Sequence, residues 1–187
     1  GKGGKGGAGG KEEARHGWLE RVRDARGRAA GEEGYDGTTL HVPEAALARL
    51  SPFERQFWEV KAAHFDTVVF FKKGKFYELY EMDADVGHRE FGLKLTDRVN
   101  MRMVGVPEQV APQWIAKLLA RGYRVTQVDQ VESAVGAARR AGSGARPVIR
   151  REVTRVLTPG TLTDPRYLSA AAAPLLDRAA LYIYLSG

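Results

Sequence analysis

Residues 68–82 read Val-Val-Phe-Phe-Lys-Lys-Gly-Lys-Phe-Tyr-Glu-Leu-Tyr-Glu-Met, and this stretch decides the fold. Two aromatic-rich runs flank a polar break that contains a glycine, Lys72–Lys75, which is the usual signal for two strands joined by a tight turn. Side chains alternate along a strand, so Phe76, Glu78 and Tyr80 are predicted to share one face. A ring and a carboxylate beside lysines would suit a flat, polar, negatively charged partner. An ordinary core aromatic beside a solvated carboxylate fits the same spacing.

Helix and strand signals alternate on both sides of this stretch. Ser51-Pro52-Phe53-Glu54 combines an N-cap serine, a proline at the first helical position and a glutamate that completes a capping box. Residues 67–72 are apolar on both faces, which is typical of a central strand covered on both sides. Further helices are predicted over residues 83–92 and 112–121, and further strands over 123–132 and 148–159. The predicted fold class is therefore α/β.

Composition narrows the class of protein. The 187 residues carry a net charge of +6 and no cysteine, which excludes disulfide frameworks and thiolate zinc sites. No apolar run reaches membrane-spanning length, so we expect no membrane partner. Twelve of the 22 glycines precede Thr38, in a segment rich in Gly, Lys, Arg and Ala. We expect residues 1–34 to be a disordered basic arm, which would attract phosphates or act as a plain tether.

Several separated motifs resemble the MutS family, in the right order. Residues 74–80 resemble its Phe-x-Glu motif, residues 103–107 its Gly-Ile-Pro or Gly-Phe-Pro strand end, and residues 150–161 a further match. The lead-in Tyr35–Pro43 is similar to the segment before the mismatch-binding domain in the eukaryotic MutS homologue six, the mismatch-reading subunit of MutS-alpha. It disfavours the plant-specific MutS homologue seven. The resemblance implies a mixed β-sheet flanked by helices.

The resemblance also implies a role for single residues. In that family the phenylalanine stacks on a mispaired base from the minor groove, and the glutamate hydrogen-bonds the same base. Carried over to this sequence, Phe76 is the wedge and Glu78 the reader. The cations expected at the DNA backbone are Lys72, Lys73, Lys75, Arg98 and Arg102. The implied setting is DNA mismatch repair in the nucleus, on double-stranded DNA with mismatches or small loops, in a heterodimer with MutS homologue two.

The same resemblance divides the chain into parts. We expect a disordered arm at 1–34, a lead-in at 35–50, the mismatch-binding domain at 51–165, an Ala-rich linker at 166–180 and the first strand of a connector domain at 181–187. Because that strand has no partners here, we expect the sequence to be a piece of a longer protein. No phosphate-binding ATPase loop is present, since Gly10-Lys11 is followed by Glu12. We therefore expect neither enzymatic activity nor a cofactor for this piece, whereas the full-length relative would be an ATPase that uses ATP and Mg²⁺.

Two other functions stay open. The first is a structural or docking α/β module, in which the aromatic strand is core and the arm is a tether. The second is a nuclease-like domain, in which an acidic cluster holds Mg²⁺; its members would be Glu78, Glu81, Asp83 and Asp85. These four residues alternate over two elements, and the two aspartates also suit a helix cap and first turn. We therefore predict no metal site.

Overall fold

The computed structural model describes residues 16–98, 100–142, 147–160 and 167. In this part of the chain six strands form one sheet in the order β3-β4-β2-β1-β5-β6. β1 pairs parallel with β5 and antiparallel with β2, and the other pairs are antiparallel. The predicted mixed sheet is thereby confirmed. The strands are β1 (Thr67–Lys73), β2 (Phe76–Tyr80), β3 (Thr96–Arg98), β4 (Met101–Pro107), β5 (Arg124–Gln130) and β6 (Arg151–Leu157).

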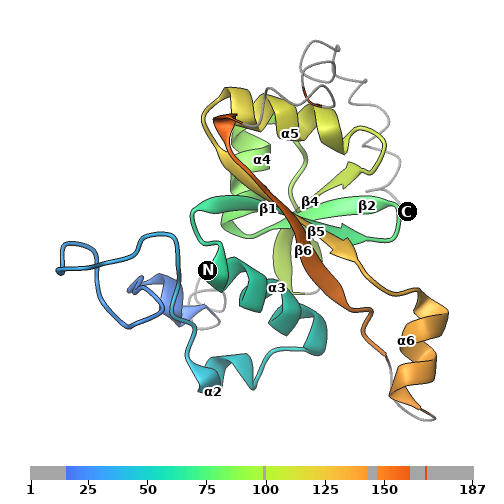
Figure 1. Cartoon of the computed structure of the whole chain (residues 1–187), viewed down its shortest axis with the longest axis horizontal. Coiled ribbons are helices and arrows are strands. Elements are labelled where there is room, and N and C mark those ends of the chain that lie inside the picture. Colours follow the sequence, from blue (N-terminus) through green and yellow to red (C-terminus); the bar gives the residue numbers. More distant parts are fainter. Residues whose placement is uncertain (1–15, 99, 143–146, 161–166, 168–187) are drawn as a thin grey trace, which may run out of the picture.

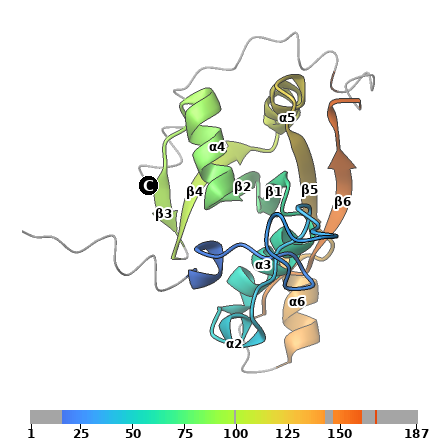
Figure 2. The ribbon, with the colours of Figure 1, turned by 90° about the vertical axis from the view of Figure 1, so that its left-hand side faces the viewer.

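Helices cover both faces of the sheet, α3 on one side and α4 and α5 on the other (Figure 1 and Figure 2). The predicted capping box is present, because Ser51 Oγ accepts from the Glu54 amide and Glu54 Oε2 accepts from the Ser51 amide. No helix among the described residues is long and apolar enough to cross a bilayer. The helices are η1 (Gly17–Leu19), α2 (Glu44–Leu47), α3 (Pro52–Ala63), α4 (Met82–Phe91), α5 (Ala111–Ala120) and α6 (Ala134–Ala141).

β1 is the central strand of the fold. Val68 and Phe70 belong to the core beneath α4 and α5, whereas Val69 and Phe71 belong to the core beneath α3. All four are at most 4% exposed. The prediction of a doubly covered strand is confirmed, and this burial on both faces anchors the turn that follows β1.

The folded lead-in includes residues 16–34, which precede its expected start at residue 35. Residues 16–34 were predicted to be part of a disordered arm, but they fold back onto the α3 side of the domain. The Trp18 ring packs edge-on against Trp58, with ring centroids 5.3 Å apart. The Leu40 amide donates to Ala62 O at 2.8 Å, which ties the lead-in to the end of α3. The prediction is wrong for residues 16–34, because an aromatic ring distant in sequence offers Trp18 the burial that its neighbours lack.

A buried carboxylate organises this lead-in. Asp24 accepts hydrogen bonds from the amides of Arg26, Arg28 and Asp36 and from the Arg28 guanidinium. Burial by itself would raise the pKa of Asp24, but these hydrogen bonds lower it to about 2. The lead-in therefore folds around the Asp24 carboxylate, which is negatively charged at neutral pH. Residues 1–15, most of the predicted linker and the predicted strand at 181–187 lie outside the described residues.

Candidate nucleic-acid interface

β1 and β2 form the predicted hairpin, and Gly74 and Lys75 make its turn. Lys73 pairs with Phe76 across the two strands. Gly74 adopts a φ of +59°, a left-handed conformation that glycine reaches without strain. Its amide donates to Gln130 Oε1 at 2.9 Å, so the turn is held against the end of β5. The hairpin is thus a supported projection of the central strand.

Phe76 lies at the first position of β2, where the strand leaves the turn. Its backbone pairs with Pro107 of β4, and its side chain is only partly buried. Tyr80 Oη donates to Glu78 Oε2, which shows that Glu78 and Tyr80 share a face as predicted. Alternation along the strand places Phe76 on that same face. The ring therefore lies on the face of Glu78 and Tyr80, next to the turn, and is only partly buried.

Glu78 is buried, unlike the accessible carboxylate that a reader of bases requires. Its side chain is 0% exposed, and its Oε2 lies 3.1 Å from Lys73 Nζ as well as against Tyr80 Oη. The Lys73 side chain is 34% exposed. The expected wedge and reader are therefore neighbours on one face, but the second is covered by a lysine of the same hairpin.

The three lysines of the hairpin do not form one group. Lys75 is exposed at the turn, and Lys73 lies on the face of Phe76. Lys72 lies on the opposite face, over the Tyr77 ring, with its Nζ 2.6 Å from Glu108 Oε2. Lys72 is 8% exposed. A contact between Lys72 and the DNA backbone stays a prediction, and alternation along β1 places this lysine on the face opposite Phe76.

The two expected arginines lie on either side of the β3–β4 turn, Arg98 at the end of β3 and Arg102 near the start of β4. Arg102 is five residues from Pro107, roughly 17 Å at the rise of an antiparallel strand. Its guanidinium lies 3.1 Å from Asp85 Oδ2 and 3.6 Å from Glu81 Oε2. Arg98 pairs with Met101 in the neighbouring strand. The structure thus separates the expected cations into a hairpin group and a β3–β4 group.

The four carboxylates of the alternative nuclease site do not converge. Each of them contacts a cation: Glu78 contacts Lys73, Asp83 contacts Lys61, and Glu81 and Asp85 contact Arg102. Within the described residues no group of three or more His, Cys, Asp and Glu could hold a metal ion. Nothing in this arrangement favours metal-dependent cleavage.

Arg151 supports the hairpin, although sequence analysis did not single it out. It begins β6, reaches across β5, and donates from Nε to Lys72 O at 2.6 Å. Its guanidinium lies 5.0 Å from the Phe53 ring and 5.3 Å from the Phe71 ring. Burial lowers the pKa of Arg151. No local pattern identifies such a brace, because Arg151 and Lys72 are 79 residues apart in the chain and only the strand order β1-β5-β6 brings them together.

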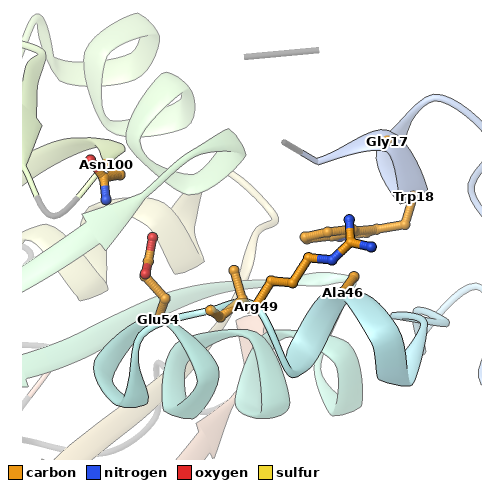
Figure 3. Close-up of a pocket in the computed structure, with 7 residues that line it drawn as sticks. Gly17, Trp18, Ala46, Arg49, Glu54 and Asn100 are labelled. Carbon is orange, nitrogen blue, oxygen red and sulfur yellow. The ribbon is translucent and has the colours of Figure 1, made fainter. Parts of the chain in front are cut away.

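A hollow with a volume of about 380 Å³ lies near the β3–β4 turn. Its walls come from η1, α2, the start of α3 and the turn, and include Trp18, Arg49, Glu54 and Asn100. Figure 3 shows the Arg49 side chain extending beside the Trp18 ring, with Glu54 and Asn100 on the other side. The sequence could not have indicated this hollow, because one wall belongs to the segment that was expected to be disordered.

Comparison with known proteins identifies a matching domain family and several similar proteins. Residues 51–166 match the family model of MutS domain I. The chain is 43% identical over 156 residues to the DNA mismatch repair protein MSH6 of Saccharomyces cerevisiae, covering 82% of this chain and 12% of the relative. It is 42% identical over 151 residues to MSH7 of Arabidopsis thaliana (79% and 13%) and 44% identical over 148 residues to MSH6 of the same plant (78% and 11%). The chain therefore spans only about one eighth of the length of these relatives.

Proposed function

Because the chain belongs to the MutS family and carries that family's domain I, we propose that it is the mismatch-binding domain of a DNA mismatch repair protein. We further propose that it detects mispaired or looped double-stranded DNA by inserting the Phe76 ring from the minor groove. The observation that supports this role is the position of Phe76, which is partly exposed next to the turn, whereas Tyr80 on the same face is 0% exposed.

The energetics of inserting the ring favour a mispaired base step over a correctly paired one. Partial unstacking of a base step costs roughly a few kcal/mol, and stacking on an aromatic ring returns about 1–3 kcal/mol per base. A mispaired step is already weakly stacked, so its unstacking cost is smaller. Discrimination then comes mainly from how easily the duplex deforms.

Glu78 would read the displaced base. A misplaced base exposes a hydrogen-bond donor, or a ring nitrogen that can share a proton with a carboxylate, whereas paired bases do not. Because Glu78 is 0% exposed in this structure, reading requires it to be uncovered. The lysines of the turn would offset repulsion between this carboxylate and the phosphates.

The cations would contact two separate stretches of DNA backbone. Lys73 and Lys75 lie beside the wedge, and Arg98 and Arg102 lie on either side of the β3–β4 turn. Phosphate contacts fix the register of a protein on DNA without reading its sequence. Each contact contributes about 0.9 to the slope of log affinity against log salt. Lys72 lies apart from both groups because Glu108 holds it on the other face.

From its family membership we also propose the activity, location and partner of the whole protein. It would be an ATPase that uses ATP and Mg²⁺ in a part beyond this chain, would act in the nucleus, and would pair with MutS homologue two. The names of the relatives, which are DNA mismatch repair proteins, support the process and do not by themselves identify the partner.

Fluorescence anisotropy with matched and G·T duplexes tests the proposal. Phe76→Ala should abolish the preference for the G·T duplex and leave salt-sensitive general binding in place. Phe65→Ala is the matched control, since Phe65 is also partly buried but precedes the opposite end of β1. An unchanged preference in Phe76→Ala would refute the wedge. Absence of binding to either duplex would favour the docking-module alternative.

A further inference from the structure

The structure holds the Glu78 carboxylate under two side chains. Tyr80 Oη donates to Oε2, and Lys73 Nζ lies 3.1 Å from the same oxygen. We infer that Lys73 is a positioning residue that closes over Glu78 when no DNA is bound and must leave it before Glu78 can contact a base. This inference rests on the proposed function, and it assigns to Lys73 a control over the reader that differs from a simple phosphate contact.

Lys73 is the partner that can move. Tyr80 is 0% exposed and is packed among aromatic rings of α3, with its centroid 5.8 Å from Phe53 and 5.1 Å from Phe57. Its release would require repacking of the core. Lys73 is 34% exposed at the end of β1 and has a long, flexible stem, so rotamer changes alone can withdraw its ammonium group. Tyr80 therefore fixes the carboxylate, and Lys73 decides whether it is covered.

Charge explains why the cover exists and how it opens. A buried carboxylate is disfavoured unless cations lie near it, and in the free protein Lys73 Nζ lies 3.1 Å from Glu78 Oε2 while the Arg151 guanidinium also acts on this charge. On a matched duplex no base offers a donor to Glu78, so the contact between Lys73 and Glu78 stays intact. On a mismatched duplex the displaced base replaces Lys73 at the carboxylate, so the contact is broken only there.

Breaking the contact between Lys73 and Glu78 therefore lowers the affinity for the mismatched duplex alone. Lys73→Met keeps most of the aliphatic stem and removes the ammonium group that has to be displaced. We expect this variant to bind both duplexes more weakly, because a cation is lost. Its preference for the G·T duplex over the matched duplex should nevertheless rise by about two- to fivefold, the range that a partly exposed ion pair supplies.

A double-mutant cycle on the 187-residue chain tests this coupling. Anisotropy with matched and G·T duplexes is measured for the wild type, Lys73→Met, Glu78→Gln and the double variant. The gain in preference should disappear in the Glu78→Gln background, where no ion pair has to be broken. Lys75→Met is the matched comparison, since this exposed lysine of the same turn should weaken binding to both duplexes by the same factor in either background.

The outcomes distinguish a failure of the role inferred for Lys73 from a failure of the proposed function. A Lys73→Met preference equal to that of the wild type, or a gain that persists with Glu78→Gln, would overturn the role of Lys73 and leave the wedge intact. A wild-type chain that shows no preference for G·T would refute the proposed function itself. Urea unfolding of the same four proteins without DNA adds a further check, because additive effects of the two substitutions would show that Lys73 and Glu78 are not coupled in the free protein.

Discussion

The ion pair between Lys61 and Asp83 joins three elements inside the domain. Lys61 Nζ, from α3, donates to Asp83 Oδ1 of α4 at 2.7 Å and to Thr67 O at the start of β1 at 2.6 Å. Asp83 Oδ2 accepts from the Val69 amide of β1 at 3.0 Å. The two side chains are 1% and 3% exposed. Replacing Lys61 with methionine, which has a similar length, would leave the Asp83 carboxylate buried without its cation.

The expected loss of stability depends on how deeply the ion pair is buried and not on the distance between its nitrogen and oxygen atoms. Removing one partner of a buried, hydrogen-bonded ion pair costs about 3–5 kcal/mol. The surface pair Arg55–Glu59 offers a matched control, since its nitrogen and oxygen lie 2.8 Å apart but the side chains are 46% and 51% exposed. Arg55→Met should cost about 0.5 kcal/mol or less. Two ion pairs of nearly equal length should therefore differ severalfold in their contribution to stability.

Urea unfolding at neutral pH, followed by circular dichroism, measures both losses. Burial raises the pKa of Asp83, and loss of Lys61 withdraws a contact that lowers it. A carboxyl group whose pKa is higher in the folded state stabilises the protein at low pH, and this stabilisation is lost as pH rises through the folded-state pKa. The deficit of Lys61→Met should therefore shrink as pH falls toward the ordinary aspartate range.

Two results would refute this reasoning. One is a loss below about 1 kcal/mol for Lys61→Met, and the other is a loss equal to that of Arg55→Met. If the single variant does not fold, Lys61→Met combined with Asp83→Asn should recover much of the stability, because no buried charge remains. Failure of that double variant to fold would show that the hydrogen bonds, and not the charges, hold these elements together.

Two more predictions concern the lead-in and the helical glycines. The Asp24 carboxylate, with a pKa near 2, should lose its contribution as pH falls from the ordinary aspartate value of about 3.9 toward about 2; Asp24→Asn should release the lead-in already at neutral pH, measured as faster amide hydrogen exchange over residues 24–42. A Cβ at Gly87 in α4 would lie 3.0 Å from Val104 Cγ2, so Gly87→Ala should cost about 1–3 kcal/mol in urea unfolding. Gly136 in α6 has only ordinary contacts at that position, so Gly136→Ala should stabilise by about 0.5–1 kcal/mol, and equal effects at the two glycines would contradict the packing argument.

Local patterns were enough for the elements that carry the site. The hairpin followed from a glycine in a polar break, the start of α3 from its capping box, and the common face of Glu78 and Tyr80 from alternation along a strand. Each of these depends on residues within a few positions of one another. The resemblance to the MutS family was likewise carried by short motifs, and the family comparison confirmed it.

The tertiary structure decided which groups are covered and which charges are paired. Residues 16–34 fold because Trp18 finds Trp58, forty positions later in the chain. Lys61 finds Asp83 across twenty-two positions. The cover that Lys73 places over Glu78 depends on the burial that α3 and β4 create around the strand. Burial and charge pairing depend on segments that only the folded chain brings together, so alternation in the sequence predicted which face Glu78 occupies but not that this carboxylate is buried beside Lys73.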